Sequence, residues 1–449
     1  MKVYGLLAAV VALVVLSGLV YWSNKTEEAK AGKPDPNAPP KILDLKEDTV
    51  AKISIDKMGA QPVVVARGQD GEWKLTAPEA LPADQDAVKG VLTTVSSLDA
   101  SRLLEDKVTN KASYGLDHPE LTVVVTQKDG KAKTLEVGDE TPTGSNYYAM
   151  LDGDSRLFTV ASYNKTGVEK TAWDLRDKRL LPFDSDKLSR VELTAKGQTV
   201  EIGKNNRNEW QIVAPQPMRA DGGQVESLIS DLRDAKMETD PATVSNSNLV
   251  TERFNKGARI ATAKVTDAAG VEQMEVRKTP EGDYYARSSA VDGIHKITNS
   301  VAEGMDKGVD DLRNHKLFDF GFSEPNRIEF KDGDKTTVFE KSGDKWMRAG
   351  KAVDAVALRS LIDKLRDLAA KSFPQHNFTA ATVEWKVTWD GGQRTDHVLM
   401  VKSGDAYYAK RQGEPSIYEL GVSDVDTMLD AARHIQDEAA KTAADKKKS

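Results

Sequence analysis

The residues that come nearest to a catalytic pattern are Ser162 and Lys165, in the run Ser162-Tyr163-Asn164-Lys165. This run fits the Ser-x-x-Lys pattern of penicillin-binding enzymes, in which the serine is the nucleophile. The next residues, Lys165-Thr166-Gly167, also spell the second motif of those enzymes. In such enzymes, however, the serine opens a helix and the Lys-Thr-Gly run lies on a distant strand, so two overlapping motifs cannot form one site. We expect no catalysis here.

Patterns for metal and phosphate chemistry are also missing from the sequence. The histidines are scattered, without the i, i+4 or short-loop spacing that metal sites use. Asp152-Gly153-Asp154 and Asp332-Gly333-Asp334 look like fragments of a calcium loop, but both lack its bidentate glutamate, so hairpin turns are the better interpretation. We therefore predict that the protein is not an enzyme and has no catalytic residue, no cofactor and no metal. The histidines are His118, His295, His315, His376, His397 and His434.

Pairs of tyrosines admit a binding function. They recur as Tyr147-Tyr148-Ala149, Tyr284-Tyr285-Ala286 and Tyr407-Tyr408-Ala409. Exposed aromatic faces could stack on sugars or peptides. Neighbouring strand residues point to opposite faces, however, so we expect one tyrosine of each pair to lie in the core and the other to lie over the sheet. The structural interpretation is favoured, and Trp73, Trp210 and Trp346 are likewise expected in the core.

The elements that must position these residues follow a pattern that occurs three times. Each copy has a tryptophan strand, then an aspartate, then four apolar residues spaced for one face of a helix. Asp84, Asp221 and Asp354 are the predicted helix N-caps. The apolar sets are Val88, Val91, Leu92 and Val95; Val225, Leu228, Ile229 and Leu232; and Leu358, Leu361, Ile362 and Leu365. The chain is therefore predicted to be an internal triplicate.

The predicted fold class is α+β. Alternating strands form an antiparallel meander before each capped helix, and a second set of strands with a closing helix follows it. The predicted division of the chain is an anchor at 1–24, a proline-rich linker at 25–43, repeats at 44–183, 184–322 and 323–438, and a basic tail at 439–449. The run Trp173-Asp174-Leu175-Arg176-Asp177-Lys178 and its echo Asp310-Asp311-Leu312-Arg313-Asn314-His315 look like joints between repeats, and the third copy lacks such a joint.

Several of these segments carry a resemblance to a known family. The Trp-x-Leu-x-x-Pro strand with Ala83-Asp84, the element from Tyr114 to Pro119, the segment from Gly138 to Tyr148 and Leu175-Arg176-Asp177 together resemble the bacterial domain of unknown function 4340. The first third of the chain matches well. The second third has Phe254 and Gly257 where the first has Tyr114-Gly115-Leu116, and the last third lacks more of the family's motifs. The resemblance implies an envelope protein with an amino-terminal membrane anchor, often encoded beside ABC-2-type and gliding-type transporter components. It implies no catalytic residues.

The amino terminus supports that expectation. Val3 to Trp22 is an uncharged, mostly apolar run with Tyr4, Tyr21 and Trp22 at its ends, about the ~20 residues that span a bilayer. A cleaved signal peptide is the alternative, although no A-x-A-like site closes the run. Flanking charges do not decide the orientation, and we place the body outside the cytoplasm because of the short amino-terminal tail, the absence of cysteine and the family resemblance.

Two hypotheses of function remain open from the sequence. The first is a non-enzymatic, membrane-anchored accessory or scaffold subunit of an ABC-type or gliding-type transport system, held in the inner membrane and bound to a membrane protein such as a transporter permease. The second is a periplasmic glycan- or peptide-binding module. A net charge of −7 without a basic face makes nucleic acid an unlikely partner. The partner, any ligand and the oligomeric state are not fixed by the sequence.

Overall fold

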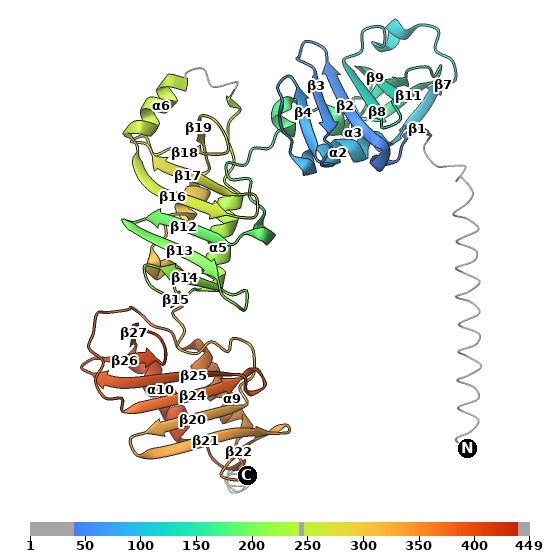
Figure 1. The fold of residues 1–449 in the computed structure, drawn as a ribbon. Helices are drawn as coiled ribbons and strands as arrows, with labels where there is room; N and C mark the ends of the chain where they lie inside the picture. The colour runs from blue at the N-terminus through green and yellow to red at the C-terminus, as the bar shows by residue number, and fades with distance from the viewer. Residues whose placement is uncertain (1–39, 242–246, 439–449) are drawn as a thin grey trace, which may run out of the picture. The chain divides into compact units, whose positions relative to one another are not determined.

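In the computed structural model, which describes residues 40–241 and 247–438, the chain forms antiparallel sheets with helices packed on them (Figure 1). The α+β prediction is therefore confirmed. The chain divides into two compact units between Lys178 and Arg179. The second unit contains two sheets, and we call residues 179–313 the middle body and residues 314–438 the C-terminal body. No helix within the described ranges is long and apolar enough to cross a bilayer, and the predicted anchor (1–24) and tail (439–449) lie outside those ranges.

The first unit contains a sheet with the strand order β5-β4-β3-β2-β8-β9-β10-β11-β7 and a small sheet of β1 and β6. The main sheet consists of two meanders that meet where β2 pairs with β8. Its elements are β1 (Lys41–Asp44), η1 (Glu47–Thr49), β2 (Val50–Lys57), β3 (Val63–Arg67), β4 (Trp73–Ala77), β5 (Leu81–Pro82), α2 (Gln85–Ser96), β6 (Ser97–Asp99), β7 (Arg102–Glu105), η2 (Lys111–Tyr114), β8 (Leu121–Gln127), β9 (Ala132–Glu140), β10 (Asn146–Leu151), β11 (Leu157–Ala161), α3 (Ser162–Val168) and α4 (Ala172–Leu175).

The middle body has the strand order β15-β14-β13-β12-β16-β17-β18-β19. Its meanders meet where β12 pairs with β16. Its elements are η3 (Ser185–Lys187), β12 (Arg190–Ala195), β13 (Gln198–Lys204), β14 (Trp210–Ala214), β15 (Met218–Arg219), α5 (Gly222–Arg233), α6 (Ser247–Lys256), β16 (Ala258–Thr266), β17 (Val271–Lys278), β18 (Tyr284–Ser288), β19 (Ile294–Lys296), α7 (Asn299–Gly304) and α8 (Val309–Leu312).

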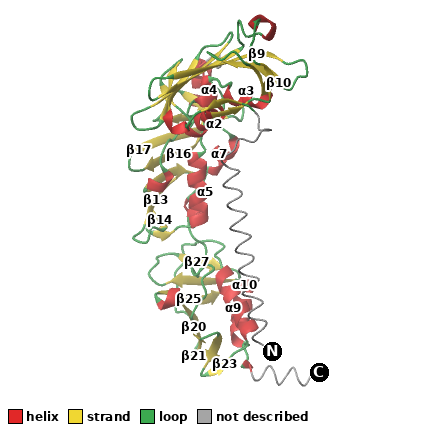
Figure 2. Ribbon diagram, turned by 90° about the vertical axis from the view of Figure 1, so that its right-hand side faces the viewer, coloured by secondary structure: helices red, strands yellow, loops and turns green. Residues whose placement is uncertain are grey.

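The C-terminal body has the strand order β23-β22-β21-β20-β24-β25-β26-β27. Figure 2 shows α9 and α10 side by side on one face of this sheet. Its elements are β20 (Arg327–Asp332), β21 (Lys335–Ser342), β22 (Lys345–Arg348), β23 (Lys351–Ala352), α9 (Ala355–Asp367), β24 (Val383–Trp389), η5 (Asp390–Gly392), β25 (Arg394–Ser403), β26 (Ala406–Arg411), β27 (Ile417–Leu420) and α10 (Val422–Arg433).

Strand register repeats along with strand order. The tryptophan of each first meander faces a basic residue on the neighbouring strand, in the pairs Arg67↔Trp73, Lys204↔Trp210 and Lys341↔Trp346. The alanine of each Tyr-Tyr-Ala run is fully buried and faces the last strand, in the pairs Ala149↔Phe158, Ala286↔His295 and Ala409↔Tyr418. The sequence pattern therefore marks equivalent places in the three sheets.

The three aspartates cap helices as predicted. The Asp84 carboxylate accepts from the backbone N–H groups of Asp86 and Ala87, and Asp221 and Asp354 make equivalent bonds at the starts of α5 and α9. These bonds satisfy N–H groups that have no partner within the helix. All the apolar residues predicted for the helix faces are buried. They join each helix to the core of its sheet.

Replacing Asp354 by alanine is expected to lower the free energy of unfolding of the C-terminal body by about 0.5 to 2 kcal/mol, because two N–H groups of α9 lose their acceptor. A calorimetric melt of the full chain measures the effect. Asp354→Asn is the control, because asparagine is an equally good cap. A melting temperature unchanged in Asp354→Ala would show that the cap contributes nothing.

The structure corrects the predicted end of the linker. Lys41 to Leu43 were assigned to the linker, but they belong to β1. This strand pairs with β6, the strand that follows α2, and Leu43 is buried in the first core.

The C-terminal body lacks the joint sequence, but a backbone pairing like that of a joint is present. The backbone of Gln436 and Asp437 pairs beside Asp354, as the backbone of Leu312 and Arg313 pairs beside Asp221. This pairing uses backbone groups alone, so the sequence pattern did not reveal it.

The residues of the Tyr114 element have a structural role. Tyr114 packs against Tyr148 with ring centroids 4.9 Å apart, and Leu116 is buried beside Met150. Gly115 has a φ of 64°, and a side chain there would collide with Asp139. The element therefore covers the outer face of the first sheet, where a left-handed glycine is needed.

Candidate functional site

The Ser-x-x-Lys run occupies the short helix α3, with Ser162 as its first residue. The Lys165 side chain is buried, and its ammonium donates to Glu120 at 3.1 Å and to Glu169 at 2.6 Å. Burial alone would lower the pKa of Lys165, but these two hydrogen bonds outweigh it and hold the pKa above its ordinary value. A lysine that stays protonated cannot take up a proton as a general base. Thr166 and Gly167 continue the same helix, as the overlap of the motifs predicted.

The histidines and the Asp-Gly-Asp runs lie in separate parts of the described structure. In the described part of the chain, no three or more acidic or histidine side chains are arranged to hold a metal ion. His315 lies between the carbonyl oxygens of Ala370 and Asp310. Gly153 and Gly333 both have positive φ at turns between paired strands, so the hairpin interpretation of those runs is confirmed.

The outer tyrosine of each pair is covered. Tyr148 packs on Tyr114, and Tyr408 stacks on His376 with centroids 3.8 Å apart. Tyr285 is 8% exposed and lines a cavity of about 590 Å³ beside α6. Tyr148 and Tyr408 are thus both partly buried, each against the ring of another side chain. The expectation that one tyrosine of each pair is core holds for Tyr407, whereas both tyrosines of the middle pair are buried.

The three tryptophans differ in their surroundings. Trp73 is 5% exposed and belongs to the first core, as predicted. Trp346 packs against its core with part of the ring exposed. Trp210 is half-buried, and its indole N–H donates to Glu226 at 2.7 Å. Trp210 and Trp346 are thus both only partly buried, so full burial in a core is found for Trp73 alone, and Trp210 also lines an open cleft.

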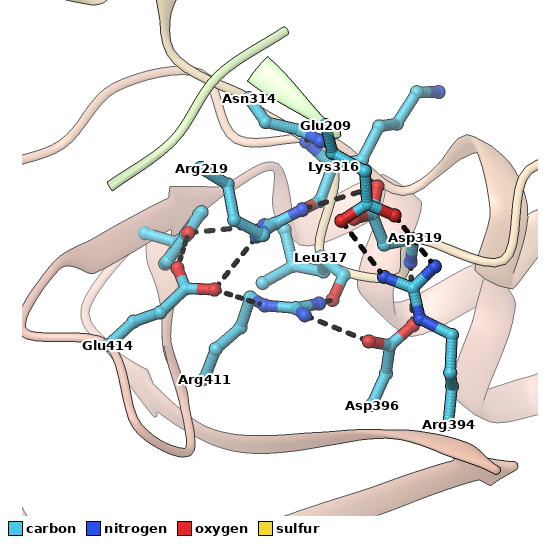
Figure 3. A network of polar contacts seen from close by, with 11 residues as sticks. Glu209, Arg219, Asn314, Lys316, Leu317, Asp319, Arg394, Asp396, Arg411 and Glu414 are labelled. Carbon is cyan, nitrogen blue, oxygen red and sulfur yellow. Dashed lines mark hydrogen bonds and ion pairs between the residues drawn. The ribbon is translucent and has the colours of Figure 1, made fainter. Parts of the chain in front are cut away.

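That cleft has a volume of about 810 Å³ and is lined by residues of the middle and C-terminal bodies. Beneath it, a group of charged side chains joins the two bodies (Figure 3). We call this group the inter-body network. It consists of Arg219 from β15 in the middle body and Asp396, Arg411, Glu414 and Tyr418 from the C-terminal body.

Arg219 is the middle body's contribution to the inter-body network. Its guanidinium donates to Glu414 at 2.8 Å, to the carbonyl oxygen of Lys316 and, at 3.3 Å, to Tyr418. A further nitrogen lies 3.5 Å from the Asp319 carboxylate. One side chain of the middle body thus reaches a carboxylate, a hydroxyl and a backbone group of the next body. Planar guanidinium groups suit such multiple contacts.

Arg411 is the most deeply buried cation of the network. Its side chain is 10% exposed, and it donates to Asp396 and to Glu414, both at 2.8 Å, and to the carbonyl oxygen of Leu317. Asp396 is itself 7% exposed at its side chain and accepts the backbone N–H of Asp319 at 2.6 Å. Buried charges of this kind persist only when each has its partners. Arg411 therefore joins the loop that follows Arg313 to the sheet of the C-terminal body.

Two further contacts lie beside the network. Arg394 pairs with Glu209 of the middle body at 3.0 Å. Arg313 donates to Ser416 at 2.7 Å, and its guanidinium lies 3.3 Å from the centroid of the Phe373 ring. The side chain of Arg313 therefore extends from the middle body into the C-terminal body. These contacts extend the area over which the two bodies are joined.

Ionisation in the network is set by burial and by neighbouring charges. Burial alone would raise the pKa of Glu414, but the cations Arg219 and Arg411 hold it below its ordinary value. Burial, together with the Glu414 carboxylate, raises the pKa of Tyr418 to about 12. Glu414 is therefore ionised and Tyr418 neutral at pH 7, so the tyrosine can donate its proton to the carboxylate.

The second unit is expected to lose stability at both extremes of pH. Glu414 has a lowered pKa, so its contribution is complete above about 4.3, the pKa of an unfolded glutamate, and is lost as the pH falls below that value. Tyr418 has a raised pKa, so its contribution is complete below about 10 and is lost as the pH rises towards its folded value. A rise from 10.0 to about 12 corresponds to about 2 to 3 kcal/mol.

Calorimetric melts of the full chain between pH 4 and pH 12 measure this dependence. Tyr418→Phe should reduce the alkaline loss while leaving the acidic loss in place, and Glu414→Gln should reduce the acidic loss. An alkaline loss of the same size in Tyr418→Phe as in the wild type would contradict the assignment.

No pattern in the sequence selects the residues of the inter-body network. They lie at positions 219, 396, 411, 414 and 418, and each residue type is ordinary for an exposed strand or turn. Arg313 of the predicted joint contacts the C-terminal body beside the network but is not part of it. Only the packing of the two bodies brings the network together.

Comparison with known proteins adds one finding. A profile of the family described as "Domain of unknown function (DUF4340)" matches residues 73–209 and, a second time, residues 210–388. The two matches begin at Trp73 and Trp210, the equivalent residues of β4 and β14. No curated protein and no solved structure matches the chain.

Proposed function

The chain belongs to the family of the domain of unknown function 4340, and from this premise we propose that it is a non-enzymatic, membrane-anchored scaffold subunit of an ABC-type or gliding-type transport system in the bacterial envelope. The amino-terminal run from Val3 to Trp22 inserts into the inner membrane, and the body lies in the periplasm. The proline-rich segment that follows acts as an extended spacer. The partner is a membrane protein of the transport system, such as its permease.

The inter-body network is the observation that carries the proposal. Arg219 crosses from the middle body to Glu414 and Tyr418, and its side chain is only 19% exposed, so separating the two bodies would leave largely buried charges without partners, at a cost of several kcal/mol. Such a network favours one mutual arrangement of the middle and C-terminal bodies. A fixed arrangement is what a scaffold needs in order to hold a partner in one position.

Pairing at the edges of two sheets indicates that a partner contacts helices and loops rather than a strand edge. The β27 edge is paired with the backbone of Lys371 and Ser372, and the Lys296 carbonyl at the end of β19 accepts the N–H of Glu238. Paired edges are poor sites for the addition of a partner's strand. We further infer from the shared strand order and register that the three sheets are copies of one duplicated unit, so that related surfaces recur along the chain.

Affinity purification from native membranes tests the proposed function. The full chain carries a C-terminal tag, is solubilised in detergent, and its partners are identified by mass spectrometry. The control carries residues 1–40 fused to an unrelated soluble protein. We expect a transporter membrane subunit to be enriched with the full chain and not with the control. Recovery of no membrane protein above the control would overturn the scaffold proposal.

Anchoring has a separate test. We expect the full chain to stay in the membrane pellet after high-salt and carbonate washes, whereas a chain that begins at Lys41 should be found in the soluble fraction. The shorter chain keeps β1, which the first core requires. Release of the full chain by carbonate would contradict the anchor.

A further inference from the structure

We propose that the cleft between the middle and C-terminal bodies binds a neutral oligosaccharide, with Trp210 as its aromatic wall. Its volume of about 810 Å³ lies within the range of about 300 to 1,000 Å³ that is usual for small-ligand sites. The half-buried Trp210 ring lines it, and the Glu226 carboxylate fixes the ring through its indole N–H. A fixed, amphipathic ring is a good surface for the C–H face of a sugar.

The start of the helix beside Trp210 differs from the start of the corresponding helix in the first unit. In the first unit, the residue after the helix cap is Gln85, and its side-chain amide bonds to both the N–H and the carbonyl group of Trp73 at 2.8 and 2.9 Å. In the middle body, the residue after the cap is Gly222, and a Cβ placed there would meet no atom within 4 Å. The space that Gln85 fills beside Trp73 is therefore open beside Trp210.

The charges of the cleft favour an uncharged ligand. Four basic and four acidic side chains line it, and they include the pairs Arg219–Glu414 and Arg394–Glu209. A balanced set of charges gives little attraction for a phosphate or a polycation. Among the described residues, no hydrogen bond engages the side-chain amides of Asn208 and Gln211, which also line the cleft. Amide groups both donate and accept, as sugar hydroxyls do.

The Lys204 side chain shares the site. Its ammonium lies 4.8 Å from the centroid of the Trp210 ring, on a flexible four-carbon stem. A sugar that stacks on that face must displace the ammonium, and a sugar hydroxyl can then accept from it. This exchange replaces a solvent-accessible cation–π contact, which is a weak interaction.

Isothermal titration of the full chain tests the proposal. The detergent must carry no sugar head group, so a polyoxyethylene detergent is used. The probes are chitotriose, cellotriose and maltotriose, with tri-alanine as a peptide probe. We expect at least one trisaccharide to bind saturably with a dissociation constant below about 1 mM, and tri-alanine not to bind.

Matched variants locate the site. Trp210→Ala removes the aromatic wall, and Gly222→Gln places in the cleft the side chain that the first unit has at Gln85. Both should weaken sugar binding by at least about tenfold. Gly90→Gln on α2 is the control, because Gly90 is also an exposed helical glycine with open space around it, and its sugar binding should be unchanged.

Three outcomes would overturn the proposal. They are the absence of saturable binding by any of the trisaccharides, binding of tri-alanine in their place, and sugar binding that persists in both Trp210→Ala and Gly222→Gln. Melting temperatures of the two variants within a few degrees of the wild type would show that lost binding is not lost folding.

Discussion

Replacing Arg411 by methionine is expected to lower the free energy of unfolding of the second unit by about 3 to 5 kcal/mol. The substitution leaves the Asp396 carboxylate, 7% exposed, without its cation, and it removes the donor to the Leu317 carbonyl oxygen. A buried charge that loses its partner keeps the cost of its desolvation. Calorimetric melts of the full chain measure the loss in the second unit.

The matched control is Lys256→Met. Lys256 pairs with Glu252 within one helix, and both side chains are more than half exposed. Ion pairs in such exposed positions contribute little to stability, so the control should change little. Equal effects of the two substitutions would show that the inter-body network is no more important than a surface ion pair.

Replacing Trp385 by alanine is expected to cost the C-terminal body about 3 to 5 kcal/mol. Trp385 on β24 is fully buried, and its ring stacks on Phe330 of the neighbouring strand with centroids 4.3 Å apart. Alanine removes this contact and leaves a cavity between the sheet and its helices. The loss should appear in a denaturant titration of the full chain as a lower midpoint for the C-terminal body.

Trp346→Ala is the comparison within the same body. Its ring is partly exposed and lies at the edge of the same core, so the cavity left behind is open to water. We expect a clearly smaller loss than for Trp385→Ala. A larger loss for Trp346 would contradict the assignment of Trp385 to the centre of the core.

Local patterns in the sequence predicted the local elements well. The cap aspartates and the four-residue apolar faces were correct because both depend on residues within one turn or two of a helix. The Tyr-Tyr-Ala runs lie on strands as predicted, but the alternation expected along a strand separates a buried from a partly exposed tyrosine only at Tyr407 and Tyr408. The partial exposure of Trp210 was not predictable in this way. After the cap, the middle body has Gly222 with open space around it, where the first unit has Gln85 bonded to the Trp73 backbone.

The inter-body network could not be predicted at all. Arg219 ends the short strand β15, and Glu414 lies in a turn where an acidic residue is ordinary. Glu414 has two of its partners, Arg411 and Tyr418, nearby in the sequence, but Arg219 has no sequence neighbour in the network. Charged residues are usually exposed, so a sequence pattern assigns them to the surface. Only a contact between residues almost 200 positions apart makes Arg219 and Glu414 partners.

The central claim is that the inter-body network holds the middle and C-terminal bodies in one mutual arrangement. Spin-label distance measurement tests it directly, because the chain contains no cysteine and labels can be placed at Val271→Cys and Val356→Cys, which are 61% and 73% exposed. We predict a single narrow distance distribution for the full chain, and a broad one when Arg219→Ala is added. A broad distribution in the unaltered network, or a narrow one that survives Arg219→Ala, would contradict the claim.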